Sequence, residues 1–372
     1  MEISLKTQLL PCLLVCALIV SSCSVEIDQT TSISSTPTVE NAPATSTASL
    51  FPSTQIPVTW AQLNLTGKLV YASSTRDGDI SMADIQILDL TTGNIARIFH
   101  MPGAWIYYTT ISPDAKWLAM SYAPPMQSDA TSNRTLYIMP LDATEPPQPL
   151  FAAPTPDDHY TQVEWSPDGK YIYFVHYNHN QSEGRFYEVY EIFRMTYPDG
   201  TPEKILDHAL WPRLSSDSSK IVYVTLDPDS GKNELFLANP DGSNSQKVPL
   251  SGPSTFEIID APIFAPDGHS ILFSAPVPIQ SYQPNWFEKL MGIRVAQAHS
   301  IASDWWSVPI TGGIPTQLTN IQTIGLFASI SPDKKRIASV SGEGLFVMDL
   351  DGSNLTQLIS DPGVHGTVSW IP

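Results

Sequence analysis

The sequence is poor in basic residues and in cysteine. It has 19 Lys and Arg against 37 Asp and Glu, which gives a formal net charge of −18 over 372 residues. Binding to nucleic acid or docking on anionic lipid needs clustered Lys and Arg, so this balance disfavours both. The three cysteines, Cys12, Cys16 and Cys23, all lie near the N-terminus. We therefore expect no disulfide in the folded part, whichever compartment it occupies.

Motifs of hydrolytic and metal chemistry are absent or incomplete. No G-x-S-x-G nucleophile elbow occurs, which excludes a hydrolase domain built around that motif. His176 and His179 have a spacing found in metal sites, but no His-x-x-x-His or Cys pair supports them. Asp77–Asp79 and Asp227–Asp229 resemble fragments of calcium loops without the glycine that an EF-hand needs. We therefore expect no metal, no cofactor and no enzyme activity.

The apolar run near the N-terminus, Leu9–Val20, is too short for a membrane span of roughly 20 residues. It follows Lys6 and is typical of a signal-peptide core. The next residues, Val20-Ser21-Ser22-Cys23, resemble a bacterial lipobox, in which the chain is cut before the cysteine and the thiol is lipidated. The resemblance implies a signal peptide over residues 1–22 and a lipid anchor on Cys23. An ordinary secretory signal or an uncleaved anchor is the alternative.

Ser, Thr and Pro make up about half of the segment from Ser24 to Pro57, which has no Lys or Arg. Such a segment buries too little apolar surface to offset the entropy lost on ordering. We expect residues 23–57 to be a lipidated cysteine followed by a disordered tether with a mean reach of about 30 Å. Residues 58–372 would form the folded domain.

That domain repeats one turn between two short strands. The copies are "ISPDAKWLAM" from Ile111, "WSPDGKYIYF" from Trp165, "LSSDSSKIVYV" from Leu214, "FAPDGHSILF" from Phe264 and "ISPDKKRIAS" from Ile330. Ser-Pro-Asp-Gly suits a type I turn, because Pro presets φ at the second position and Gly accepts the last one. The copy from Leu214 lacks both Pro and Gly.

Each repeat also has a later strand, and there are six of these against five complete turns. They are "DIQILDLTTG" from Asp84, "LYIMPLDA" from Leu136, "EIFRMTYPDG" from Glu191, "ELFLANPDG" from Glu234, "WWSVPITGG" from Trp305 and "LFVMDLDG" from Leu345. The missing turn is split between the two ends of the domain. Trp370-Ile371-Pro372 matches Trp165-Ser166-Pro167, and the segment from Thr66 to Tyr71 matches that from Asp168 to Tyr173. A ring joins first and last repeats in this way, whereas a solenoid needs distinct caps.

We therefore predict an all-β fold, a six-bladed β-propeller with four-stranded blades, whose first blade is closed by the C-terminal strand. From Gly67 to Pro372 the repeats resemble the TolB-like, WD-type propeller repeat of periplasmic and extracytoplasmic bacterial proteins. The resemblance implies an extracytoplasmic, non-enzymatic binding or scaffolding module with a protein partner in the cell envelope.

The two faces of such a propeller are expected to differ. Turns within the blades would share one face, the turn face, and second-to-third loops and inter-blade connections the other, the connection face. Long connection-face loops are expected at Tyr122–Arg134, His176–Arg185 and Pro276–Asp304, and long loops are often functional. The predicted binding residues there are Trp105, Tyr107, Tyr108, His159, Tyr160, His176, His179, His208, Trp211, Trp286 and His365. The alternative is that these side chains only cap the core.

Two further interpretations stay open. A helix predicted at about Trp286–His299, inserted in the fifth blade, has one apolar side, which could pack on the propeller, bind a partner or contact a membrane. Asp260 and Glu164 lie on predicted inner strands, where lactonase-like or dehydrogenase-like propellers carry axial carboxylates. A glycan or small-ligand receptor, or such an enzyme, is therefore the alternative function.

Overall fold

The computed structural model describes residues 60–372 except 79, 126–133, 153–154, 156–157, 183–184, 228–231, 253–255, 257 and 277–301, and only the backbone of 179–182 and 185–188. The predicted signal peptide, Cys23, the tether and the helix at Trp286–His299 lie outside these residues. The described part has one short helix, α1 (Trp60–Leu63). It contains no helix long and apolar enough to span a membrane.

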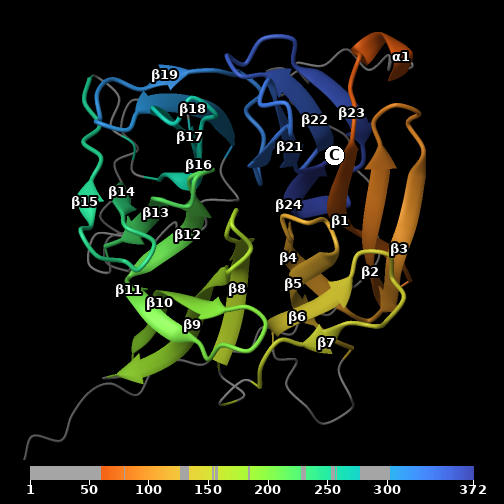
Figure 1. Ribbon diagram of the computed structural model, residues 1–372, viewed down its shortest axis with the longest axis horizontal. Helices are drawn as coiled ribbons and strands as arrows, with labels where there is room; N and C mark the ends of the chain where they lie inside the picture. The colour runs from red at the N-terminus through yellow and green to blue at the C-terminus, as the bar shows by residue number, and fades with distance from the viewer. Residues whose placement is uncertain are drawn as a thin grey trace, which may run out of the picture. The chain divides into compact units, whose positions relative to one another are not determined.

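Six four-stranded antiparallel sheets are arranged in a ring, each forming one blade (Figure 1). Blade 1 is β24 (Val364–Ile371), β1 (Lys68–Asp77), β2 (Ile80–Asp89) and β3 (Ile95–Pro102). Blade 2 is β4 (Trp105–Ile111), β5 (Trp117–Ala123), β6 (Thr135–Pro140) and β7 (Gln148–Pro149). Blade 3 is β8 (Asp158–Trp165), β9 (Tyr171–Ser182), β10 (Arg185–Thr196) and β11 (Glu203–Asp207). Blade 4 is β12 (Ala209–Leu214), β13 (Ile221–Leu226), β14 (Asn233–Ala238) and β15 (Gln246–Lys247). Blade 5 is β16 (Asp260–Phe264), β17 (Ser270–Pro276), β18 (Ser303–Pro309) and β19 (Thr316–Gln317). Blade 6 is β20 (Phe327–Ile330), β21 (Arg336–Ser341), β22 (Gly344–Asp349) and β23 (Thr356–Ser360). This is the predicted six-bladed β-propeller.

The repeated turn is held by its own serine and aspartate. In blade 2, the Ser112 hydroxyl donates to Asp114 Oδ1 at 2.6 Å and accepts the backbone N–H of Trp117 at 2.9 Å. The fourth residue of the turn has a left-handed φ, 55° at Ala115 and 57° at Ser218. Ser218 belongs to the copy without Pro or Gly, yet the same serine–aspartate hydrogen bond forms there. The serine and the aspartate therefore suffice to specify this turn.

The first blade is closed as predicted. Strand β24 pairs antiparallel with β1, so that Leu69 lies opposite Trp370, and Figure 1 shows the two strands side by side. The buried Trp370 donates its indole N–H to the Thr66 carbonyl at 3.0 Å. Its backbone N–H donates to the Ser329 hydroxyl of β20 at 3.1 Å. The N-terminal end is also joined to blade 6, because the Arg336 guanidinium of β21 donates to the Leu63 carbonyl at 3.5 Å. These contacts close the ring between blades 1 and 6.

Side chains also join neighbouring inner strands round the axis. The Thr367 hydroxyl of β24 accepts the Thr109 N–H of β4 at 2.8 Å. Thr110 in β4 accepts the backbone N–H of Trp165 in β8 at 3.2 Å. Gln162 in β8 accepts the backbone N–H of Trp211 in β12 at 2.7 Å. Because adjacent blades are bonded at their inner edges, side chains near the axis have fixed positions.

The prediction of a long loop at His176–Arg185 is wrong. Strand β9 continues through Ser182 and β10 begins at Arg185, with Tyr177 opposite Tyr190 and His176 opposite Glu191. The polar residues Asn178 and Asn180 suggested a loop, but Tyr177 and the facing residues Val189 and Tyr190 favour an extended pair of strands. His176 and His179 therefore lie in a strand of an elongated hairpin.

Candidate binding face

Three aromatic rings meet on the propeller axis. Tyr108, Trp211 and Phe327 come from β4, β12 and β20, the inner strands of alternate blades. Their ring centroids are 5.4 Å apart for Tyr108–Trp211, 5.5 Å for Tyr108–Phe327 and 5.2 Å for Trp211–Phe327. Burial raises the pKa of Tyr108, so its hydroxyl stays protonated. The three rings therefore pack against one another where the inner strands of the alternate blades converge.

The two acids expected near the axis lie in separate environments. Glu164 in β8 pairs with Arg213 in β12; burial raises the pKa of Glu164, and the guanidinium opposes that effect. Asp260 begins β16, and burial raises its pKa well above the ordinary value although the Trp211 side chain hydrogen-bonds to it. Within the described residues, no three His, Cys, Asp or Glu side chains form a metal-binding group.

Further out on the connection face, five rings and one guanidinium form a continuous row, which we call the aromatic strip. Its members are His365 in β24, Trp105 and Tyr107 in β4, Arg134 just before β6, Tyr177 in β9 and His159 in β8. They come from blades 1, 2 and 3, so the strip crosses two inter-blade junctions.

The blade 1 end of the strip is a stacked pair. His365 lies against Trp105 with a centroid distance of 5.1 Å and an angle of 24°. Each ring nitrogen of His365 is 2.8 Å from a backbone carbonyl oxygen, that of Gly363 and that of Ile106. These contacts fix the imidazole and so the Trp105 ring, which keeps 36% of its surface exposed.

At the blade 3 end, His159 stacks on the buried Tyr177 at 4.8 Å and 23°. Between the two ends, the Arg134 guanidinium lies 3.6 Å from the Tyr107 ring centroid and 5.2 Å from that of Tyr177. A guanidinium over an aromatic face is attracted by the ring quadrupole. These contacts join the two stacked ends of the strip through Tyr107 and Arg134.

His176, predicted on this face, belongs instead to a row of charges across blade 3. Its ring nitrogens lie 2.7 Å from Asp158 Oδ1 and 3.2 Å from Glu191 Oε2, and Glu191 in turn pairs with Lys204 at 2.9 Å. The row links all four strands of the blade. Burial would raise the pKa of Asp158, but hydrogen bonds from Thr155 and His176 outweigh it and lower that pKa. The row stabilises the elongated hairpin.

The structure thus brings four of the predicted residues together, Trp105, Tyr107, His159 and His365. Tyr108 and Trp211 lie on the axis, and Tyr160 is buried against Phe151 and Phe174. His208 is exposed in the connection between β11 and β12, apart from the strip. The side chain of His179 and all of Trp286 lie outside the described residues.

Sequence reasoning missed two members of the strip, Arg134 and Tyr177. Arg134 was read only as the end of a loop, and Tyr177 as part of a polar loop that is strand β9. The signal for Tyr177 was the alternation Tyr173, Val175, Tyr177, which is typical of a strand. No sequence signal pairs Arg134 with Tyr177, because they belong to different blades.

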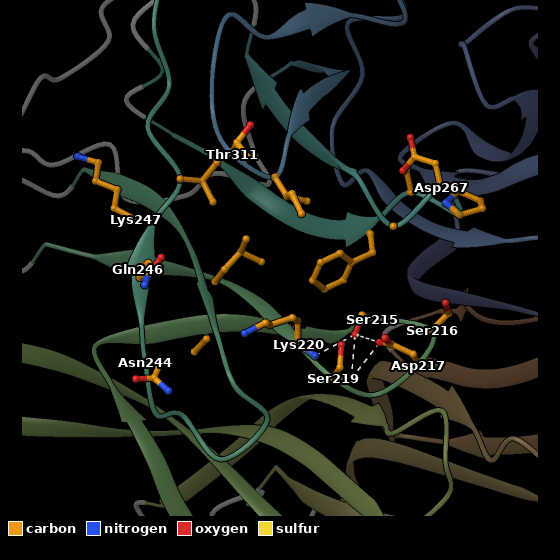
Figure 2. A pocket seen from close by; sticks show the side chains of 18 of the residues that line it. Ser215, Ser216, Asp217, Ser219, Lys220, Asn244, Gln246, Lys247, Asp267 and Thr311 are labelled. Carbon is orange, nitrogen blue, oxygen red and sulfur yellow. Dashed lines mark hydrogen bonds between the residues drawn. The ribbon is translucent and has the colours of Figure 1, made fainter.

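The turn face has a hollow of about 460 Å³ between blades 4 and 5 (Figure 2). It is lined by turn residues such as Ser215, Asp217 and Asp267. Its two lysines are already engaged, Lys220 with Asn239 at 2.9 Å and Lys247 with Glu234 at 2.5 Å. Figure 2 shows the hydrogen bonds by which Ser215 and Asp217 close their own turn with Ser219 and Lys220.

Comparisons with known proteins identify the fold. No protein-family model and no curated protein sequence matches the chain. TolB from Acinetobacter baumannii is similar in structure, with a TM-score of 0.54 and 17% identity over 82% of this chain and 67% of that one. A putative TolB from Agrobacterium tumefaciens gives 0.54 and 17% over 79% and 100%. A chain of a nidogen/laminin complex gives 0.57 and 9% over 82% and 98%. The propeller fold suggested by the repeats is confirmed.

Proposed function

We propose that this chain is a non-enzymatic, lipid-anchored propeller of the cell envelope that binds a protein partner through its connection face. The aromatic strip carries the proposal. Trp, Tyr and Arg are the residues that most often dominate binding energy at protein interfaces, and pre-ordered anchors lose little entropy on binding. The serines and aspartates of the turn face bond mainly within their own turns, as in the hydrogen bonds from Ser112 and Ser215.

Three observations support the envelope assignment. The Val20–Cys23 segment resembles a lipobox, and the Ser/Thr/Pro-rich residues after it would separate the lipid from the fold. The fold is similar to those of two TolB proteins. The net charge of −18 disfavours nucleic acid as a partner and so is compatible with a place outside the cytoplasm.

The two faces are compared by mutation. The partner is first captured by crosslinking in intact cells and then purified for affinity measurements. Trp105→Ala should weaken its binding by at least about 1 kcal/mol, since exposed aromatic anchors contribute most. Lys170→Glu and Lys335→Glu on the turn face should change affinity by less than about 0.5 kcal/mol because exposed charges contribute little.

Each variant is first shown to melt as the wild type does. Tyr160 and Trp211 are unsuitable for this test, because both are buried and alanine there would disturb the blade itself. If the lysine variants abolish binding while folded Trp105→Ala retains it, the proposed face is wrong.

A further inference from the structure

Arg134 differs from four other arginines of the described residues. Arg97, Arg194, Arg213 and Arg336 each lie within ion-pair distance of a carboxylate. Among the described residues, no carboxylate pairs with Arg134, and its buried Nε has no hydrogen-bond partner. Its guanidinium instead lies between the rings of Tyr107 and Tyr177.

Leaving this guanidinium without a carboxylate is costly in the free protein. Arginine stays charged at any accessible pH, and a partly buried charge is destabilising unless it is paired. Two tyrosine rings compensate only in part, because a cation–π contact is weaker than a charge-assisted hydrogen bond to a carboxylate. The chain has 37 acidic residues, and four other arginines have acidic partners. Among the residues that the structure describes, none pairs with Arg134, so the terminal N–H groups of its guanidinium keep their hydrogen-bonding capacity for an outside group.

The side chain is also held in place. Tyr177 is buried and backed by His159, and the Arg134 carbonyl accepts the backbone N–H of Tyr160 at 3.0 Å. Both the ring on one side of the guanidinium and its own backbone are therefore fixed. A pre-ordered guanidinium binds carboxylate with little further loss of side-chain entropy, and it can do so through two parallel N–H···O bonds.

We propose that Arg134 receives a carboxylate of the protein partner, an Asp or Glu side chain or a free C-terminus in an extended acidic peptide. The inference rests on the proposed function, that the connection face binds protein. An acidic sugar is less suited to the strip. A sugar ring stacks on an open aromatic face, whereas the Tyr177 ring beside Arg134 is buried and stacked on His159.

The test uses the folded protein and a random dodecapeptide library displayed on phage. Selected peptides should share an acidic residue, and replacing it by its amide should weaken binding by about tenfold or more, as for a charge-assisted bond. Arg134→Gln should weaken binding of the acidic peptide to the same extent and leave the affinity for the amide peptide unchanged. Arg134→Lys, which keeps the charge without the fork, should fall between them. Arg76→Gln removes the same charge from an exposed position at the end of β1 and should change nothing.

Several results would overturn the inference: no peptide selected, selected peptides without an acid, or equal effects of Arg134→Gln on the acidic and amide peptides. A galacturonate oligosaccharide is tested in parallel. If it binds the wild-type protein but not Arg134→Gln, and no peptide binds, the ligand is an acidic glycan and the inference of a protein ligand is wrong. If Trp105→Ala abolishes peptide binding and Arg134→Gln does not, the carboxylate site fails and the binding face stands. If only Lys170→Glu and Lys335→Glu abolish it, the proposed function fails.

Discussion

Asp304 shows how one buried side chain can hold a connection between two blades. Asp304 is the second residue of β18 and is fully buried beside the connection that leads to blade 6. Its Oδ1 accepts the Ile321 N–H at 2.6 Å and the Thr319 hydroxyl at 3.0 Å, and both donors lie in that connection. Burial raises the pKa of Asp304, while these hydrogen bonds oppose the rise. The carboxylate is therefore a structural acceptor for backbone that is not in a sheet.

Removing that acceptor should destabilise the propeller. Asp304→Ala leaves the Ile321 N–H and the Thr319 hydroxyl buried without their partner, and we expect a loss of about 2–3 kcal/mol in the free energy of unfolding. Asp304→Asn keeps one carbonyl oxygen and should lose less than half as much. The exposed Asp351→Ala serves as the control and should cost under about 1 kcal/mol. Urea denaturation gives all three values; an asparagine variant as unstable as the alanine one would show that the charge, not the acceptor, matters.

The sequence shows that the position of Asp304 is repeatedly acidic, but it does not show what the carboxylate binds. Acidic residues recur at the same place in four third strands, at Asp84, Glu191, Glu234 and Asp304. Their bonds differ, since Asp84 contacts His100 at 2.7 Å and Glu191 contacts His176 and Lys204. A repeat predicts that a position matters, but the partner of each copy is set by the loops around it.

Among the elements, the turns were predictable and the elongated hairpin was not. The Ser-Pro-Asp-Gly turn is local: Ser215 and Asp217 make it without Pro or Gly because their side chains supply the hydrogen bonds. The extension of β9 and β10 is not local. It depends on cross-strand pairs such as Tyr177–Tyr190 and on the row of charges through His176, none of which a single strand reveals.

Strand β24 is the element on which the ring depends. Deleting residues 365–372 removes the partner of β1 and the buried Trp370 ring. Loss of one large buried aromatic alone costs about 3–5 kcal/mol, a large share of a domain's stability. We expect the truncated protein to aggregate or to melt far below the wild type in a thermal scan.

The control for that deletion is Trp370→Phe, which keeps the strand and most of its apolar contact. It loses only the indole hydrogen bond to Thr66, so its unfolding free energy should fall by about 1–2 kcal/mol. Equal melting of wild-type and truncated protein would mean that β24 is dispensable.

On the scale of the whole molecule, the blade number could be predicted and the binding strip only in part. The six third strands, and each half of the split turn, are short patterns that can be recognised in the sequence. Together they indicated a closed ring of six blades. Trp105 and His365 were expected on one face, but the insertion of Arg134 between Tyr107 and Tyr177 depends on how blades 2 and 3 are apposed. Contacts between blades follow from packing angles that no repeat encodes.

The anchor proposal is also tested on this scale. Cys23→Ser should move the protein from the membrane fraction to the soluble fraction of fractionated cells, because no acyl chain can then be attached. Its melting temperature should equal that of the wild-type domain, since the tether separates Cys23 from the propeller. Cys16→Ser, within the expected signal peptide, is the matched control and should leave the protein membrane-bound. Retention of Cys23→Ser in the membrane fraction after a high-salt wash would contradict lipidation.

The pairing of β24 with β1 also sets the order in which folding can finish. The Trp370 indole reaches the Thr66 carbonyl across 304 positions of sequence, whereas blades 2 to 6 each draw all four strands from one continuous segment. Those five blades can form in order along the chain, but blade 1 lacks its inner strand until residues 364–371 are free to pair with β1. During that interval β1 has an unpaired edge, which is the kind of surface on which chains aggregate. The first blade in the sequence is therefore the last to be completed, and a chaperone would be of most use to this protein by covering β1 until then.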